Sequence, residues 1–85
     1  MQAITTKYFG PTNARGSRVK ATAAAGSITL DWDNRLNAER NHLKAAAALA
    51  RKFGWHGPWR GGGLADGSWC FVSMESDIEF EVPSP

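Results

Sequence analysis

The sequence predicts an α+β fold in which a single antiparallel sheet of about 4–6 strands carries one helix across one face. Short segments of alternating polar and apolar residues lie on both sides of one alanine-rich helical segment at 38–53. Glycine-, proline- and asparagine-containing turns separate these segments, which gives the order strand, hairpin, helix, hairpin, strand. At 85 residues the chain fits one domain, which we expect to cover 1–82 and to be followed by a frayed tail at 83–85.

The N-terminal part predicts three strands. Residues 2–9 are rich in Ile, Thr, Tyr and Phe, and the segment 10–17 that follows has the composition of a loop. Residues 18–24 and 27–32 alternate around a short turn and therefore predict a β-hairpin. The inward side chains of the first arm are small, so we expect another element to pack closely over it.

The helix at 38–53 has clear ends. Asn37 is suited to cap its first turn, and Gly54 fits the left-handed position that follows a helix. At 100° per residue a broad apolar arc forms. It comprises Ala38, His42, Leu43, Ala46, Ala47, Leu49, Ala50 and Phe53. The remaining face is basic and carries Arg40, Asn41, Lys44, Arg51 and Lys52.

The C-terminal part predicts a second hairpin and a last strand. Residues 59–64 and 69–73 flank an Asp-Gly turn, and the glycines at 61–63 favour a bulge or close packing over a neighbouring tryptophan. No Lys-Ser or Lys-Thr follows the glycines, so they do not form a Walker loop. Residues 77–82 alternate strictly, with Ile78, Phe80 and Val82 on one face, which predicts a half-buried final strand.

Composition excludes several classes of protein. The single cysteine, Cys70, excludes an internal disulfide framework and a multi-cysteine zinc site. No apolar run approaches the ~18 residues of a membrane span, and the first ten residues lack the apolar region of a signal peptide. We therefore expect a protein of the cytoplasm with no membrane partner.

Charge is distributed unevenly although the net charge is only +2. Residues 1–30 carry +4, residues 31–60 carry +3 and residues 61–85 carry −5. Such asymmetry indicates either a basic binding face or an acidic segment that folds against a basic one. In the second case the acidic strand at 77–82 would pair across the sheet with Lys7, Arg18 or Lys20.

The segment from Ile4 to Arg18, ITTKYFGPTNARGSR, resembles the opening of a family of short proteins encoded by phages, plasmids and integrated elements of proteobacteria. The run KFGW at 52–55 and the run GGGLADG at 61–67 fit the same pattern, and the resemblance extends over roughly 4–72. Most members have no assigned function and none supplies catalytic residues. The resemblance implies an accessory gene product acting in a host bacterial cytoplasm, a class that is rich in inhibitors of host defence such as anti-CRISPR proteins.

The first functional hypothesis is therefore a non-enzymatic inhibitor that binds a host defence complex by protein–protein contact. Exposed tryptophans next to arginine are typical of protein interfaces. The residues expected to contact the partner are Arg15, Arg18, Trp55, Trp59 and Arg60.

The alternative is a small basic module that binds nucleic acid through phosphate contacts of the 12–20 segment and the helix at 38–53. The residues expected to contact phosphates are Arg15, Arg18, Lys20, Arg40, Lys44 and Arg51.

Catalysis is not expected, because Cys70, His42 and His56 form no recognisable nucleophile or acid–base arrangement in the sequence. His42 lies in the apolar arc and is expected to be a satisfied residue at the edge of the core. Two histidines with no neighbouring ligand cluster do not make a metal site, so we expect neither a metal nor a cofactor.

The oligomeric state is left open between a monomer and a homodimer formed through an exposed edge strand.

Overall fold

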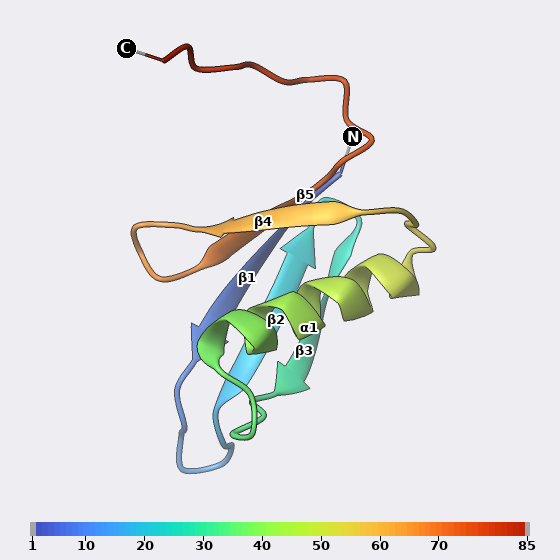
Figure 1. Cartoon of the computed structure of the whole chain (residues 1–85). Helices are drawn as coiled ribbons and strands as arrows, with labels where there is room; N and C mark the ends of the chain where they lie inside the picture. Colours follow the sequence, from blue (N-terminus) through green and yellow to red (C-terminus); the bar gives the residue numbers. More distant parts are fainter. Residues whose placement is uncertain (1, 85) are drawn as a thin grey trace.

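The computed structural model describes residues 2–84 and contains one five-stranded antiparallel sheet with a helix across one face (Figure 1). The elements are β1 (Ala3–Phe9), β2 (Arg18–Ala23), β3 (Gly26–Asp31), α1 (Ala38–Lys52), β4 (Trp59–Gly63) and β5 (Trp69–Ser73). The strand order is β3-β2-β1-β5-β4, so the first strand of the chain is the central strand of the sheet. The predicted α+β class, both hairpins and the single helix are confirmed.

The predicted strand at 77–82 is wrong. The last strand of the described chain is β5. After a turn at 74–75, residues 78–84 form no helix or strand, and the chain runs away from the sheet (Figure 1). Ile78, Phe80 and Val82 are 73%, 88% and 76% exposed. The positions on both sides of β5 in the sheet are taken by β1 and β4. The chain that leaves β5 therefore cannot add a strand next to it. The acidic residues of this segment therefore do not pair with Lys7, Arg18 or Lys20 across the sheet.

The helix packs over β1, β2 and β3, and the core lies between it and these strands. Ile4 and Ala21 are fully buried beneath it, and so is Leu49 on its inner face. The small side chains of β2 let the helix approach closely, as the sequence predicted. Asn37 caps α1 by accepting a 2.8 Å hydrogen bond from the Arg40 backbone N–H, and Gly54 follows the helix with φ +70°.

The buried stripe of α1 differs from the predicted arc. Leu43 is 50% exposed and Ala47 is exposed, whereas Ala45 is fully buried and Asn41 is 1% exposed. The helix is thus rotated toward β2 and β3, and its flank on the side of β4 and β5 is left uncovered. Asn41 was expected on the basic outer face and that expectation is wrong, for the reason given below.

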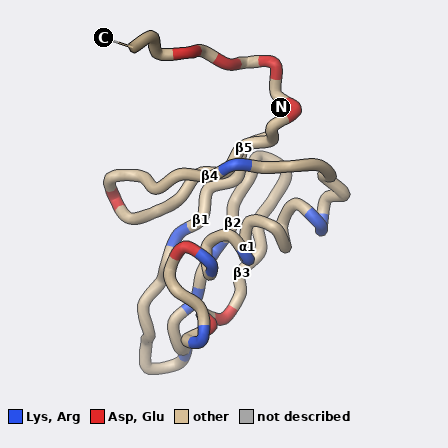
Figure 2. Tube along the Cα trace, in the orientation of Figure 1, with Lys and Arg blue, Asp and Glu red and all other residues tan. Residues whose placement is uncertain are grey.

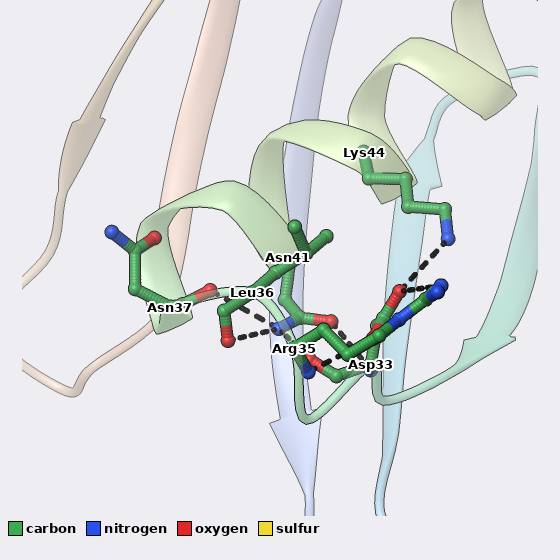
Figure 3. A network of polar contacts seen from close by, with 6 residues as sticks. All are labelled: Asp33, Arg35, Leu36, Asn37, Asn41 and Lys44. Carbon is green, nitrogen blue, oxygen red and sulfur yellow. Dashed lines mark hydrogen bonds and ion pairs between the residues drawn. The ribbon is translucent and has the colours of Figure 1, made fainter.

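Asn41 holds the loop between β3 and α1 against the helix (Figure 3). Its side-chain oxygen accepts from the Asp33 backbone N–H at 2.8 Å. Its side-chain nitrogen donates to the backbone oxygens of Asp33 at 2.9 Å, Asn37 at 3.1 Å and Leu36 at 3.3 Å. A buried amide is stable only where its donors and acceptor are matched, and here they match the loop backbone. Asn41 therefore replaces apolar packing with four hydrogen bonds at the start of α1.

The same loop carries the ion pairs of the described chain. The Asp33 carboxylate accepts from the Arg35 guanidinium at 3.0 Å and lies 3.8 Å from the Lys44 Nζ (Figure 3). Hydrogen bonds from the side chain and backbone of Arg35 lower the pKa of Asp33 to about 2. The carboxylate of Asp33 is therefore charged at neutral pH.

The second hairpin is built around an aromatic ring and a glycine. A Cβ on Gly61 would lie 2.2 Å from the Phe71 ring, so the ring occupies the place of the missing side chain. The glycine run was expected to pack over a neighbouring tryptophan. The closest approach is that of Phe71 to Gly61, while Gly63 lies in ordinary contact distance of Trp69. At the other end of β4 the Asp66 carboxylate accepts from the Ser68 backbone N–H at 3.0 Å, which closes the predicted turn. Hydrogen bonds from the side chain and the backbone of Ser68 lower the pKa of Asp66.

Candidate nucleic-acid interface

The two faces of the sheet differ in chemistry because strand residues alternate between them. Ile4 and Thr6 of β1 point toward the helix, so Lys7 and Phe9 point to the opposite face, on which no described element packs. The register brings residues of the same face together. Lys7 is paired with Lys20, Phe9 with Arg18, Lys20 with Thr29 and Arg18 with Asp31. We call the surface formed by Lys7, Phe9, Arg18, Lys20 and Thr29, with the acidic Asp31 at its edge beside Arg18, the open face.

Phe9 is 37% exposed at the centre of the basic part of the open face. The Lys7 Nζ lies 5.8 Å from the centre of its ring, and the Arg18 guanidinium carbon lies 5.9 Å from it. Both distances fall within the range of a cation–π contact. Two cations therefore lie against the ring of a residue that is still partly exposed.

The loop between β1 and β2 brings Arg15 to the same surface. Arg15, Arg18, Lys20, Phe9 and Thr29 together line a shallow hollow of about 180 Å³. The loop is shaped by Thr12, whose hydroxyl accepts from the Arg15 backbone N–H at 3.1 Å and whose own N–H donates to the Arg15 carbonyl at 2.7 Å. Three of the residues predicted to bind nucleic acid, Arg15, Arg18 and Lys20, are thus brought together.

The other three residues of that prediction lie elsewhere. Arg40, Lys44 and Arg51 are exposed on α1, which covers the opposite face of the sheet. Lys44 is also close to Asp33, which offsets part of its charge. One ligand surface cannot contact the open face and the outer face of α1 at once without wrapping around the sheet. Figure 2 shows where Lys and Arg positions occur along the chain, and it shows several Asp and Glu positions along the segment after β5.

The residues expected to contact a protein partner are also separated. Trp55 and Trp59 stack on each other with ring centres 6.1 Å apart and pack against the core near the end of α1. Arg60 is the next residue of β4 and therefore points to the opposite side of the sheet from Trp59. Arg15 and Arg18 line the hollow described above. The five residues do not form one patch.

A second hollow, of about 460 Å³, lies beside the tryptophan pair. It is lined by Gln2, Trp55, His56, Trp59, Ser73, Glu75, Ser76 and Asp77. The indole nitrogen of Trp59 is buried and, among the described residues, has no hydrogen-bond acceptor. The Trp59 side chain, which lines this hollow, therefore has a polar group that the described residues leave unsatisfied.

The groups considered for catalysis are dispersed. His42 is 2% exposed beneath the helix, where its Nδ1 lies 2.7 Å from the Thr6 hydroxyl oxygen, and burial lowers its pKa. As the sequence predicted, the His42 ring has a hydrogen-bonding partner, but it lies deeper than the edge of the core. Cys70 lies on the opposite side of the sheet, where it is paired with Thr5 and Gly62. Within residues 2–84 no group of three or more His, Cys, Asp or Glu side chains is placed to hold a metal ion.

Lys7, Phe9 and Thr29 are the site residues that the sequence analysis missed. The alternation of β1 placed Lys7 and Phe9 together, but only the register with β2 places them beside Arg18 and Lys20.

No helix among residues 2–84 is long and apolar enough to cross a bilayer. Comparisons of the chain with protein-family models, with curated proteins and with solved structures each found no match.

Proposed function

We propose that the protein binds single-stranded nucleic acid on the open face of its sheet, without catalysing a reaction. The observation that carries the proposal is the pairing of Lys7 directly with Lys20 in the register of β1 and β2. Like charges directly opposite each other in a sheet are destabilising. A bound phosphate between or beside the two ammonium groups removes that repulsion and adds two attractive contacts.

Phe9 supports a single strand over a duplex. Exposed aromatic rings on a sheet bind nucleic acid by stacking on bases, and bases are accessible in this way only where the strand is unpaired. Phe9 is 37% exposed, and two cations that suit the flanking phosphates, Lys7 and Arg18, lie 5.8 Å and 5.9 Å from the centre of its ring. Phosphate contacts of this kind position a strand without selecting its sequence.

The first test is a salt titration of binding to a labelled single-stranded oligonucleotide. The affinity is expected to fall as salt rises, and Lys20→Gln is expected to reduce the log–log slope by about 0.7, the value for one phosphate contact to a single strand. The matched control is Arg51→Gln, because Arg51 is an exposed cation on α1, away from the open face. No binding at low salt, or an equal reduction by Arg51→Gln, would refute the proposal.

The second test separates stacking from charge. Phe9→Ala is expected to weaken single-strand binding by about tenfold, in the range for loss of one stacked base, and to leave the salt slope unchanged. Binding to the matching duplex is expected to be weaker than to the single strand and to respond little to this substitution. An effect of Phe9→Ala on the salt slope alone would show that the ring only positions its two cations.

A second candidate function is the inhibition of a host defence complex by protein contact. The observation that favours it is the hollow beside Trp55 and Trp59, with the buried Trp59 N–H facing no acceptor among the described residues. Half-buried tryptophans around a hollow are typical anchor positions in protein interfaces. The resemblance of the 4–18 segment to proteins of mobile elements points to the same class of partner.

This candidate is tested in cells and by affinity capture. Tagged protein expressed in a CRISPR-active host is expected to retain a defence component and to restore phage plating. His56→Glu, which changes an exposed side chain lining the hollow, is expected to reduce both effects, and Arg51→Gln serves as the control. Unchanged plating together with no captured defence component would refute this function and leave nucleic-acid binding unaffected.

A further inference from the structure

The segment 77–82 has the pattern of a strand but no place in the sheet of its own chain. Its apolar side chains are at least 73% exposed, and they alternate with Asp77, Glu79 and Glu81. Such a segment resembles the donor strand of strand-addition complexes, in which main-chain hydrogen bonds give affinity and alternate side chains give specificity.

The outer edge of β4 is an acceptor for such a strand. β4 is the last strand on its side of the sheet. Hydrogen bonds from the Leu64 N–H to Ser68 and from the Met74 N–H to the Pro58 carbonyl show that even-numbered residues of β4 face β5. The backbone N–H groups of Gly61 and Gly63 therefore point outward. Exposed edges are commonly protected by proline, lysine or a bulge, and this edge carries three glycines instead.

An apolar groove lies along the helix side of this edge. It has a volume of about 260 Å³ and is lined by α1 residues that include Leu43 and Ala47 and by sheet residues that include Trp59 and Phe71. It exists because α1 is rotated toward β2 and β3, so that Leu43 remains half exposed. A strand added beside β4 would direct every second side chain toward this groove.

The two faces of the segment match the two sides of the β4 edge. With Ile78, Phe80 and Val82 turned toward the groove, the three carboxylates lie on the opposite side of the sheet. Arg60 is exposed on that side, and the other cations of the open face belong to the same surface. One register therefore satisfies apolar and charge complementarity together.

The segment cannot reach this edge in its own chain by a normal connection. Only residues 74–76 separate it from β5, and a strand that returned from β5 to the far side of β4 would run parallel to β4. Such a return would have to cross two strand spacings of about 4.8 Å each and also reverse the chain direction. Three residues extend over only about 10 Å, and the first of them, Met74, is still hydrogen-bonded to Pro58 in the β4–β5 hairpin. We therefore propose that the segment 77–82 of one copy adds to the β4 edge of a second copy, and that the exchange is reciprocal in a two-fold homodimer.

The direct test is the mass of the intact chain by light scattering over a range of concentrations. The wild type is expected to reach twice the 9.2 kDa of one chain. Phe80→Asp is expected to weaken the dimer by about 100-fold or more, because two buried rings are lost per dimer. Phe80 is 88% exposed within one chain, so its replacement leaves the fold intact. The matched control is Leu64→Asp, which removes another exposed apolar side chain in the β4–β5 turn and is expected to leave the mass unchanged.

Amide hydrogen exchange locates the contact. The Gly61 and Gly63 amides are expected to be protected in the wild type and to exchange rapidly in Phe80→Asp, because their N–H groups have partners only in the dimer. A monomeric wild type, or a dimer that Phe80→Asp does not weaken, would overturn the proposal. Protection of these amides in a monomer would also overturn it, since the segment would then cover its own edge.

A peptide experiment tests the same edge without dimer formation. The Phe80→Asp chain keeps an intact β4 edge, so a synthetic peptide of residues 75–84 is expected to bind it and to restore protection of Gly61 and Gly63. The same peptide carrying Phe80→Asp is expected not to bind. Equal binding of both peptides would show that the charges alone hold the segment, contrary to the proposal. None of these measurements depends on nucleic-acid binding.

Discussion

The same strands form both faces of the sheet, but the two faces differ in chemistry. The helix packs on one of them, the covered face, whereas the open face exposes cations to solvent. In β1, Ile4 and Thr6 are fully buried under the helix, whereas Lys7 and Phe9 on the opposite face are exposed. The covered face satisfies its polar groups internally, as in the contact between Thr6 and His42. The open face places like charges against each other in the pair Lys7 and Lys20. Stability is therefore expected to reside on one side of the sheet and ligand binding on the other.

Asn41→Ala is the substitution on the covered side of the sheet that is expected to lower the free energy of unfolding most. This substitution leaves the Asp33 N–H without its acceptor and removes the donor to three backbone oxygens. Because buried groups are left unsatisfied, we expect a loss of about 3 kcal/mol in the free energy of unfolding, measured by urea denaturation. Asn37→Ala, which removes only the cap of α1, is expected to lose about 1 kcal/mol. Similar losses for both variants would contradict the role given to Asn41.

His42, which is buried on the covered face, is expected to make the free energy of unfolding depend on pH. Burial lowers its pKa in the folded protein, so the unfolded chain binds more protons than the folded chain as the pH falls below the ordinary value of 6.5. The free energy of unfolding is therefore expected to decrease as the pH is lowered through this region and to be largest above it. Urea denaturation at a series of pH values from about 5 to 8, the range in which histidine ordinarily titrates, measures this change in the free energy of unfolding.

The control for this pH dependence is His56→Gln, since His56 is exposed in the loop after α1. This variant is expected to keep the whole pH dependence. If the dependence disappears in His56→Gln, then the buried histidine is not its source.

The smallest expected effect has the opposite sign. Lys20→Gln removes the like-charge pair with Lys7 and is expected to increase the free energy of unfolding by a few tenths of a kcal/mol, to about 0.5 kcal/mol, at low salt. The same substitution is expected to weaken oligonucleotide binding. A variant that is more stable and binds less well would show that the open face is shaped by its ligand. A loss of stability in Lys20→Gln would remove that argument.

Local signals in the sequence were sufficient for most elements. The Asn37 cap and the glycine at 54 defined the helix ends, and the Asp-Gly turn defined the second hairpin. The segment at 77–82 was predicted wrongly because alternation reports an amphipathic strand and not whether a partner strand is available. Asn41 was misplaced because its partners are backbone groups of a loop, which no side-chain periodicity reveals.

The candidate site was predicted only in part for a similar reason. Arg15, Arg18 and Lys20 are near in sequence and were grouped correctly in space. Their separation from the cations of α1 depends on which face the helix covers, and the addition of Lys7 and Phe9 depends on the strand register. Register is set by contacts between segments that are distant in sequence, so it is not contained in any local pattern.

The approach of Phe71 to Gly61 has a consequence for how this chain can diverge. Gly61 has no room for any side chain while Phe71 is present, whereas a Cβ on Gly62 would meet nothing within 4 Å and one on Gly63 only ordinary contacts with Trp69. Three adjacent and chemically identical positions thus differ in the substitutions they tolerate. In a saturation library selected for folding, position 61 should accept larger residues only in clones where position 71 has become smaller, while position 62 should vary on its own.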